Sequence, residues 1–199
     1  MAETKNILGL HLPTDPRWVR MAEMRIEDIL TDHAYCEQKA ASTCISLITQ
    51  FPEYENLVEK LSPLVTEEWG HFRMVLRELK KRKLTLGRQR KDQYVNALMK
   101  MQRTGGRAED RLVDKLLIFA LIEARSCERF RLLSLNINDP ELQRFYHDLM
   151  VAEAAHYRLF IDLANTVKPE EIVRRRWKEY LEAEVEILKN IEVRGDRIH

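Results

Sequence analysis

The sequence predicts an all-α protein built as a bundle of long helices. Apolar residues recur at i, i+3, i+4 and i+7 over long stretches, the period of a helix that buries one face. Only six prolines and six glycines interrupt these stretches, and none of the stretches alternates as a strand does. At 199 residues, 45% hydrophobic and 33% charged, the chain suits a single domain over residues 1–199 around one core.

The helices are expected in a clear order along the chain. After an irregular start, segments are predicted at about 18–30 and 32–50, and a third from Glu53 to about Lys83. The third helix must contain Pro63 as a kink; the alternative is a new helix that begins at Pro63 with Ser62 as its cap.

In the second half of the chain, the sequence predicts four more helical segments after a basic, glycine-containing loop at 80–91. A short helix should end near Arg103, before Gly105 and Gly106, and a long one should follow over about 109–135. Asn138-Asp139-Pro140-Glu141 is a strong start signal for a helix to about 166. Pro169-Glu170-Glu171 opens a last, highly charged helix to about 191.

Charge, hydropathy and cysteine content exclude several classes of protein. A formal charge of +1 excludes a globally basic nucleic-acid binder, although a local basic patch remains compatible. The apolar runs are too short to cross a bilayer and the N-terminus lacks a signal-peptide layout, so we expect a soluble cytoplasmic protein without a membrane partner. Cys36, Cys44 and Cys127 form no CxxC pair, which argues against a thiolate metal site or a disulfide framework.

Two Glu-x-x-His pairs, Glu68 with His71 and Glu153 with His156, carry the functional signal. Residues at i and i+3 of a helix share a face, so each pair can offer a carboxylate and an imidazole to one metal. Each pair also has an upstream glutamate: Glu37 precedes Glu68 by 31 residues, and Glu123 precedes Glu153 by 30. The chain thus resembles two copies of one helical hairpin.

Helix rise supports this hairpin interpretation. About 15 residues separate each upstream glutamate from the turn, and about as many lead back to the Glu-x-x-His pair, roughly 22 to 24 Å each way. The ligands on the outgoing and returning helices should therefore lie level. This agreement favours a helix that continues through Pro63.

Glutamate and histidine in this pattern indicate a di-iron centre. Four buried carboxylates would be prohibitively costly without cations, and mixed carboxylate and imidazole ligation suits iron or manganese. The pattern is that of a ferritin-like four-helix bundle, expected over about 32–166, with extra N-terminal, connecting and C-terminal helices. Glu128 is an alternative to Glu123 that breaks the matched spacing. His33, one turn before Glu37, is expected at the surface, with support of the metal site as the alternative.

Four sequence motifs resemble those of a known family. They are Asp32-His33-Ala34-Tyr35-Cys36-Glu37-Gln38-Lys39-Ala40-Ala41, Ser62-Pro63-Leu64 followed by Glu67-Glu68 and His71-Phe72, Glu123-Ala124-Arg125-Ser126-Cys127-Glu128-Arg129-Phe130, and Glu153-Ala154-Ala155-His156-Tyr157. Through these motifs, and over about residues 18–176, the chain resembles the tRNA 2-methylthio-N6-isopentenyladenosine hydroxylases.

The resemblance implies a non-haem di-iron monooxygenase that hydroxylates the isopentenyl group of a modified adenosine beside the tRNA anticodon. It implies two iron ions, dioxygen as co-substrate, tRNA as substrate, and a separate reductase or ferredoxin as electron donor. The implied ligands are the six residues that the spacing also selects: Glu37, Glu68, His71, Glu123, Glu153 and His156. The sequence does not indicate an oligomeric state.

A tRNA substrate also requires a phosphate-binding surface. Two basic clusters are the candidates, with a merely solvated loop as the alternative for the first. They comprise Lys80, Lys81, Arg82, Lys83, Arg88, Arg90 and Lys91, and then Arg174, Arg175 and Arg176. The rival functions are a ferritin-like or rubrerythrin-like di-iron oxidase or peroxidase without a nucleic-acid substrate, and a helical interaction protein that has lost its metals.

Overall fold

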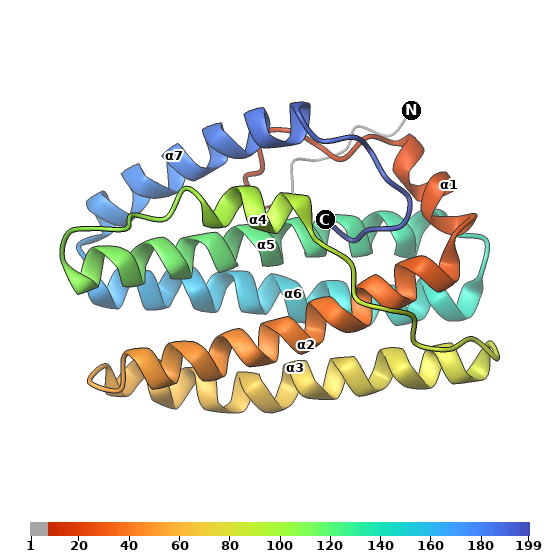
Figure 1. Cartoon of the computed structure of the whole chain (residues 1–199), viewed down its shortest axis with the longest axis horizontal. Helices are drawn as coiled ribbons and strands as arrows, with labels where there is room; N and C mark the ends of the chain where they lie inside the picture. The colour runs from red at the N-terminus through yellow and green to blue at the C-terminus, as the bar shows by residue number, and fades with distance from the viewer. Residues whose placement is uncertain (1–7) are drawn as a thin grey trace. The chain divides into compact units, whose positions relative to one another are not determined.

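The computed structural model describes residues 8–199, and over that range it contains seven helices and no strand (Figure 1). The all-α prediction is therefore confirmed. The helices are α1 (Arg17–Glu23), α2 (Ile26–Gln50), α3 (Glu55–Lys81), α4 (Gln93–Met99), α5 (Ala108–Asn136), α6 (Pro140–Val167) and α7 (Glu170–Lys189).

The chain divides into two compact units, and each contains one of the predicted hairpins. The α2–α3 unit comprises residues 20–91 and 194–198, and the α5–α6 unit comprises the described residues up to 19, residues 92–193 and His199. The prediction of a single domain over 1–199 stays a prediction, and its first seven residues lie outside the described part of the chain.

The α2–α3 unit is an antiparallel hairpin whose two helices pack along their length (Figure 1). A short turn at residues 51–54 joins them. The facing sides are apolar and buried: Ile29, Leu30, Ala34, Ala41, Cys44 and Leu47 from α2, and Leu57, Leu61, Leu64, Val75 and Leu79 from α3. Helix α3 runs through Pro63 without a break, so the continuous-helix interpretation is confirmed and the alternative start at Pro63 is wrong.

The boundary between the first two helices differs from the prediction. The helix expected over 18–30 ends at Glu23, and α2 begins at Ile26 rather than at Asp32. Thr31 and Asp32 resemble a helix cap in sequence, but tertiary partners use their side chains: Thr31 Oγ1 accepts from Gly87 N at 3.2 Å, and Asp32 Oδ2 accepts from Ile198 N at 2.8 Å. Both residues are therefore buried within α2 instead of marking its start.

The segment 194–198 is held against the start of the α2–α3 unit. Arg90 donates to Asp28 Oδ1 at 2.7 Å and to Asp196 Oδ2 at 3.2 Å. A Cβ atom on Gly195 would lie 2.4 Å from the backbone of Met21, so only glycine allows this approach.

The α5–α6 unit contains the second hairpin together with α4 and α7 (Figure 1). Asp139 caps α6 by accepting from the backbone N–H groups of Glu141 and Leu142, and Pro140 occupies the first helical position, as the sequence predicts. Helix α5 carries an almost continuous buried apolar surface because α4, α6 and α7 all pack against it.

A buried ionic network ties α5 to α7 within this unit. The guanidinium of Arg125 is fully buried and donates to Glu184 Oε1 at 2.9 Å, to the Leu12 carbonyl at 3.0 Å and to Glu128. Tyr94 donates to the same oxygen of Glu184 at 2.7 Å. Burial lowers the pKa of Arg125, but Glu184 and Glu128 outweigh it and hold that pKa above its usual range, so the group stays charged.

Candidate metal centre

In the α2–α3 unit, three of the predicted ligands lie together and are buried. Glu37 comes from α2, and Glu68 and His71 come from one turn of α3, and each offers a ligand atom within 4.8 Å of the others. His71 Nδ1 lies 3.6 Å from Glu37 Oε2 and 3.6 Å from Glu68 Oε2. The matched helix rise has therefore brought this half of the predicted site to one level.

A fourth side chain of this cluster, His33, was expected at the surface, and that expectation is wrong. His33 is fully buried, and its Nε2 lies 2.6 Å from Glu37 Oε1. Residues i and i+4 of a helix lie on the same face, so the spacing between His33 and Glu37 was the feature of the sequence that could have predicted their contact. Each oxygen of Glu37 therefore has a neighbouring imidazole, since Oε1 faces His33 and Oε2 faces His71.

The electrostatics of this cluster favour positive charge between the carboxylates. Burial lowers the pKa of His71, but the adjacent carboxylates of Glu37 and Glu68 reverse this and raise it to about 10. Burial raises the pKa of Glu37, while His33 and His71 outweigh that effect and hold it well below its usual range. The two carboxylates therefore favour the protonated, positively charged form of His71.

In the α5–α6 unit, the other three predicted ligands are buried on two facing helices. Glu123 lies on α5, and Glu153 and His156 lie one turn apart on α6. Glu123 and His156 offer ligand atoms within 4.8 Å of each other. The α5–α6 hairpin has thus buried the same set of side-chain types as the α2–α3 hairpin.

Neither Glu128 nor Cys127 is arranged as a metal ligand in this unit. Both carboxylate oxygens of Glu128 are bonded to the Thr14 residue, through its N–H at 3.0 Å and its hydroxyl at 2.6 Å. Burial, with Glu123 and Glu128 nearby, raises the pKa of Cys127 to about 11, and its thiol donates to the Met150 carbonyl at 3.3 Å. The matched spacing is therefore favoured over the alternative ligand Glu128.

The donor sets in both units fit iron. Each unit supplies two carboxylates and one imidazole, with no thiolate among them, and such hard oxygen and borderline nitrogen donors suit Fe²⁺ or Mn²⁺ rather than a soft metal. In the α2–α3 unit, the ligand atoms of Glu37, Glu68 and His71 all lie within 4.8 Å of one another, close enough for one cation to bind them together.

Most members of the basic clusters lie at the surface, but three arginines are half-buried and held by acidic neighbours. Arg82 pairs with Glu78, Arg90 pairs with Asp28 and Asp196, and Arg176 pairs with Asp114 at 2.8 Å. These arginines have structural partners. The remaining members are exposed, and of these Lys81 also pairs with Glu78 at 3.2 Å. They are Lys80, Lys81, Lys83, Arg88, Lys91, Arg174 and Arg175.

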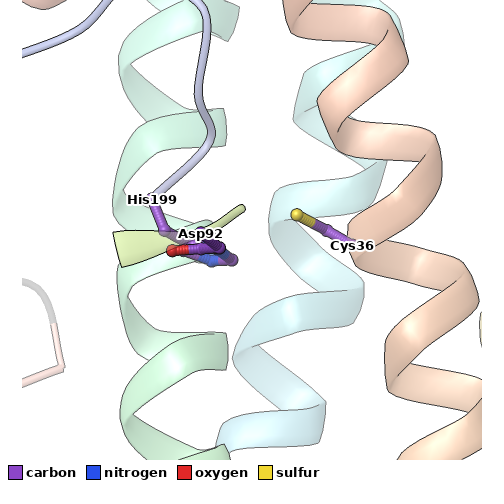
Figure 2. Close-up of side chains that lie close together, drawn as sticks. All are labelled: Cys36, Asp92 and His199. Carbon is purple, nitrogen blue, oxygen red and sulfur yellow. The ribbon is translucent and has the colours of Figure 1, made fainter. Parts of the chain in front are cut away.

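The α5–α6 unit contains a further polar cluster that the sequence pattern did not predict. His199 Nδ1 lies 3.3 Å from Asp92 Oδ2, and His199 Nε2 lies 2.8 Å from Ser126 Oγ. Figure 2 shows the side chains of His199 and Asp92 close together. The ring of Tyr94 stacks on His199 at 5.6 Å between centroids. Ser126 lies in the interior of α5, where the backbone N–H groups donate to carbonyls of the helix and cannot form an oxyanion hole. We therefore interpret this buried Ser-His-Asp arrangement as structural and not catalytic.

The two helical hairpins with their buried Glu, Glu-x-x-His sets define a ferritin-like carboxylate-histidine protein. A solved structure agrees: a protein described as "Protein 43 with aldehyde deformylating oxygenase activity from Synechococcus" matches with a TM-score of 0.90 and 35% identity, covering 96% of this chain and 94% of that one. Among the described residues, no helix is both long and apolar enough to cross a membrane.

The family model for the tRNA-(MS[2]IO[6]A)-hydroxylases (MiaE) matches residues 2–199, and the chain belongs to that family. A Pseudomonas putida relative is 38% identical over 181 residues, covering 91% of this chain and 87% of its own length. A Salmonella typhimurium relative is 28% identical, covering 83% of this chain and 78% of its own. Both are named tRNA 2-(methylsulfanyl)-N(6)-isopentenyladenosine(37) hydroxylase.

Proposed function

We propose that the protein is a dioxygen-dependent di-iron monooxygenase that hydroxylates the isopentenyl group of 2-methylthio-N6-isopentenyladenosine in tRNA, next to the anticodon. The observation that carries the proposal is family membership over residues 2–199, with two relatives named for this reaction. The proposal is also supported by the six buried carboxylate and imidazole side chains, which all lie in the motifs that resemble those of the family.

The iron ligands under this proposal are the three buried donors of each unit. They are Glu37, Glu68 and His71 from the α2–α3 unit, and Glu123, Glu153 and His156 from the α5–α6 unit. A pair of iron ions, when bound, supplies the activation of dioxygen that an unactivated C–H bond requires.

The protein's own contribution is to hold these donors and to exclude water from them. All six are buried in helices rather than loops, so backbone hydrogen bonds fix their positions. His33 holds Glu37 in place through its Nε2. The four carboxylates would balance the charge of two divalent cations, and bound cations would offset most of the cost of burying them.

The reaction also requires an external electron donor and a tRNA partner. One oxygen atom of dioxygen enters the C–H bond and the other leaves as water, which consumes two electrons and two protons from outside the substrate. We propose a separate reductase or ferredoxin as the source, and the cytoplasm, where tRNA is used, as the location. The exposed members of the two basic clusters are the first candidates for contact with tRNA phosphates.

The decisive experiment is mass analysis of tRNA nucleosides from a strain that lacks the gene. Loss of the hydroxylated nucleoside with accumulation of its precursor, restored by the wild-type gene and not by one encoding Glu153→Ala, is the expected result. Unchanged nucleosides would favour a rubrerythrin-like oxidase or peroxidase. Purified protein without two irons per chain would favour a helical interaction protein.

A further inference from the structure

Helix α3 carries a pocket that is lined in part by one of the proposed ligands. The pocket has a volume of about 340 Å³, and all of its lining residues belong to α3: Glu67, Gly70, His71, Arg73, Met74 and Arg77. Gly70 and Met74 make part of its wall apolar, and His71 stands at its edge.

Positive charge dominates the helix beside this pocket. From Trp69 to Lys81 the exposed charged side chains are all basic: Arg73, Arg77, Lys80 and Lys81. The only acid in that stretch is Glu78, which is buried and paired with Lys81 and Arg82. The spacings i, i+4 and i+7 place Arg73, Arg77 and Lys80 along one stripe about 10 Å long.

An exposed aromatic side chain lies at the start of the same stripe. Trp69 is one turn before Arg73 and is 47% exposed, unusual for so large an apolar residue. Its indole lies 4.8 Å from the ring of Phe72 at an angle of 36°, which supports the indole from one side. Basic side chains interleaved with an exposed aromatic ring are the features that bind single-stranded RNA, because phosphates pair with the cations and bases stack on the ring.

We propose that this face of α3, from Glu67 to Lys81, binds the single-stranded anticodon loop of the tRNA, an inference that rests on the proposed function. Arg73 and Arg77 pair with backbone phosphates, and Trp69 stacks on an unpaired base. The pocket receives the apolar substituent of the modified adenosine beside His71, and Glu67 accepts a hydrogen bond from a ribose hydroxyl. The basic loop after α3 then extends this surface instead of forming it.

The first test measures the salt dependence of RNA binding with a labelled anticodon stem-loop that carries the unhydroxylated modified base. Arg73→Ala/Arg77→Ala should weaken binding on the order of tenfold, reduce the slope of log K against log salt by about 1 to 2, and raise KM with little change in kcat. Lys60→Ala is the matched control, since Lys60 is an exposed cation on the same helix about 20 Å away. An unchanged slope in the double variant would overturn the proposal.

The second test distinguishes base stacking on Trp69, and the effect of the negative charge of Glu67, from a general loss of folding. Trp69→Ala should weaken binding roughly five- to a hundredfold with the salt slope unchanged, while Trp69→Phe, which keeps an aromatic face, should retain most of the affinity. Glu67→Gln removes a negative charge and should not weaken binding by more than the loss of one neutral hydrogen bond. Equal loss in both Trp69 variants, or a duplex RNA that binds as tightly as the loop, would contradict the assignment.

Failure of this surface and failure of the proposed function give different results. Wild-type protein that hydroxylates the stem-loop, with both arginine and tryptophan variants equally active and equally tight, rejects the surface and leaves the function intact. Wild-type protein that binds the loop through these residues but never hydroxylates it supports the surface and rejects the function.

Discussion

The two hairpins carry the same ligand pattern in different surroundings. In the α2–α3 unit His33 lies one turn before Glu37 and contacts it at 2.6 Å, whereas the corresponding residue one turn before Glu123 is Phe119, which packs on Phe160 at 5.9 Å between centroids. The α5–α6 unit instead buries an ionic network around Arg125 and adds α4 and α7. One hairpin supports its single glutamate with a polar neighbour, and the other relies on helix packing.

A metal-ligand pattern can therefore be repeated in a chain without repetition of the contacts that support it. Outer polar partners of metal ligands usually contribute ten- to a hundredfold in metal affinity. We therefore expect the α2–α3 half to depend on a specific hydrogen bond, and the α5–α6 half to depend on the stability of its core.

The largest effect should come from removing one ligand in each half. Glu68→Ala and Glu153→Ala each leave an incomplete donor set, so both should abolish hydroxylation and lower iron content, measured by metal analysis of the purified protein. If the halves serve one centre, the two variants should lose iron alike. A variant that keeps two irons per chain would remove that residue from the ligand set.

Arg125→Met should cause the next largest effect, on stability rather than on chemistry. Removing the guanidinium leaves the buried Glu184 without its main counter-charge, which costs about 3 to 5 kcal/mol, measured by chemical denaturation. The double variant Arg125→Met/Glu184→Leu should recover part of this loss, because it removes the fully buried carboxylate, while Glu128 keeps its two hydrogen bonds from Thr14. A single variant as stable as the wild type would show that the network is dispensable.

His33→Ala should have a smaller effect that is confined to the α2–α3 half. We expect metal affinity to fall about ten- to a hundredfold, with the melting temperature of the metal-free protein less affected than by Arg125→Met. His33→Gln, which can still donate to Glu37, should restore part of the affinity. The counterpart substitution Phe119→Leu should leave metal affinity unchanged, and a loss there equal to that of His33→Ala would erase the distinction between the halves.

The smallest effect concerns the pH dependence of the metal-free protein. Because the pKa of His71 is raised to about 10 from its usual 6.5, its contribution to stability is complete below about 6.5 and is lost as the pH rises through about 10. Metal-free protein should therefore lose stability over that window, as thermal melts would show, and His71→Gln should flatten the curve. Iron binding should flatten it as well, since the cation replaces the proton.

Local pattern was sufficient to predict the helices and the buried donors. The apolar period and the Asp139-Pro140 start placed α6 within a residue or two, and matched separations of 31 and 30 selected six side chains that are all buried. The start of α2 was missed because Thr31 and Asp32 bond to Gly87 and Ile198, residues that are far away in the sequence. The fold class is confirmed, while the metal-ligand roles stay predictions.

The sequence by itself determined which segments are helical and which carboxylates and imidazoles share a helix face, because both follow from a backbone period that repeats every few residues. Only the tertiary structure decided which charges are already paired. Arg90 and Arg176 are bonded to acids more than sixty residues away, His33 is enclosed, and Arg73 and Arg77 remain exposed beside a pocket. Pairing of this kind depends on how distant segments pack, and the spacing of residues along one helix does not encode it.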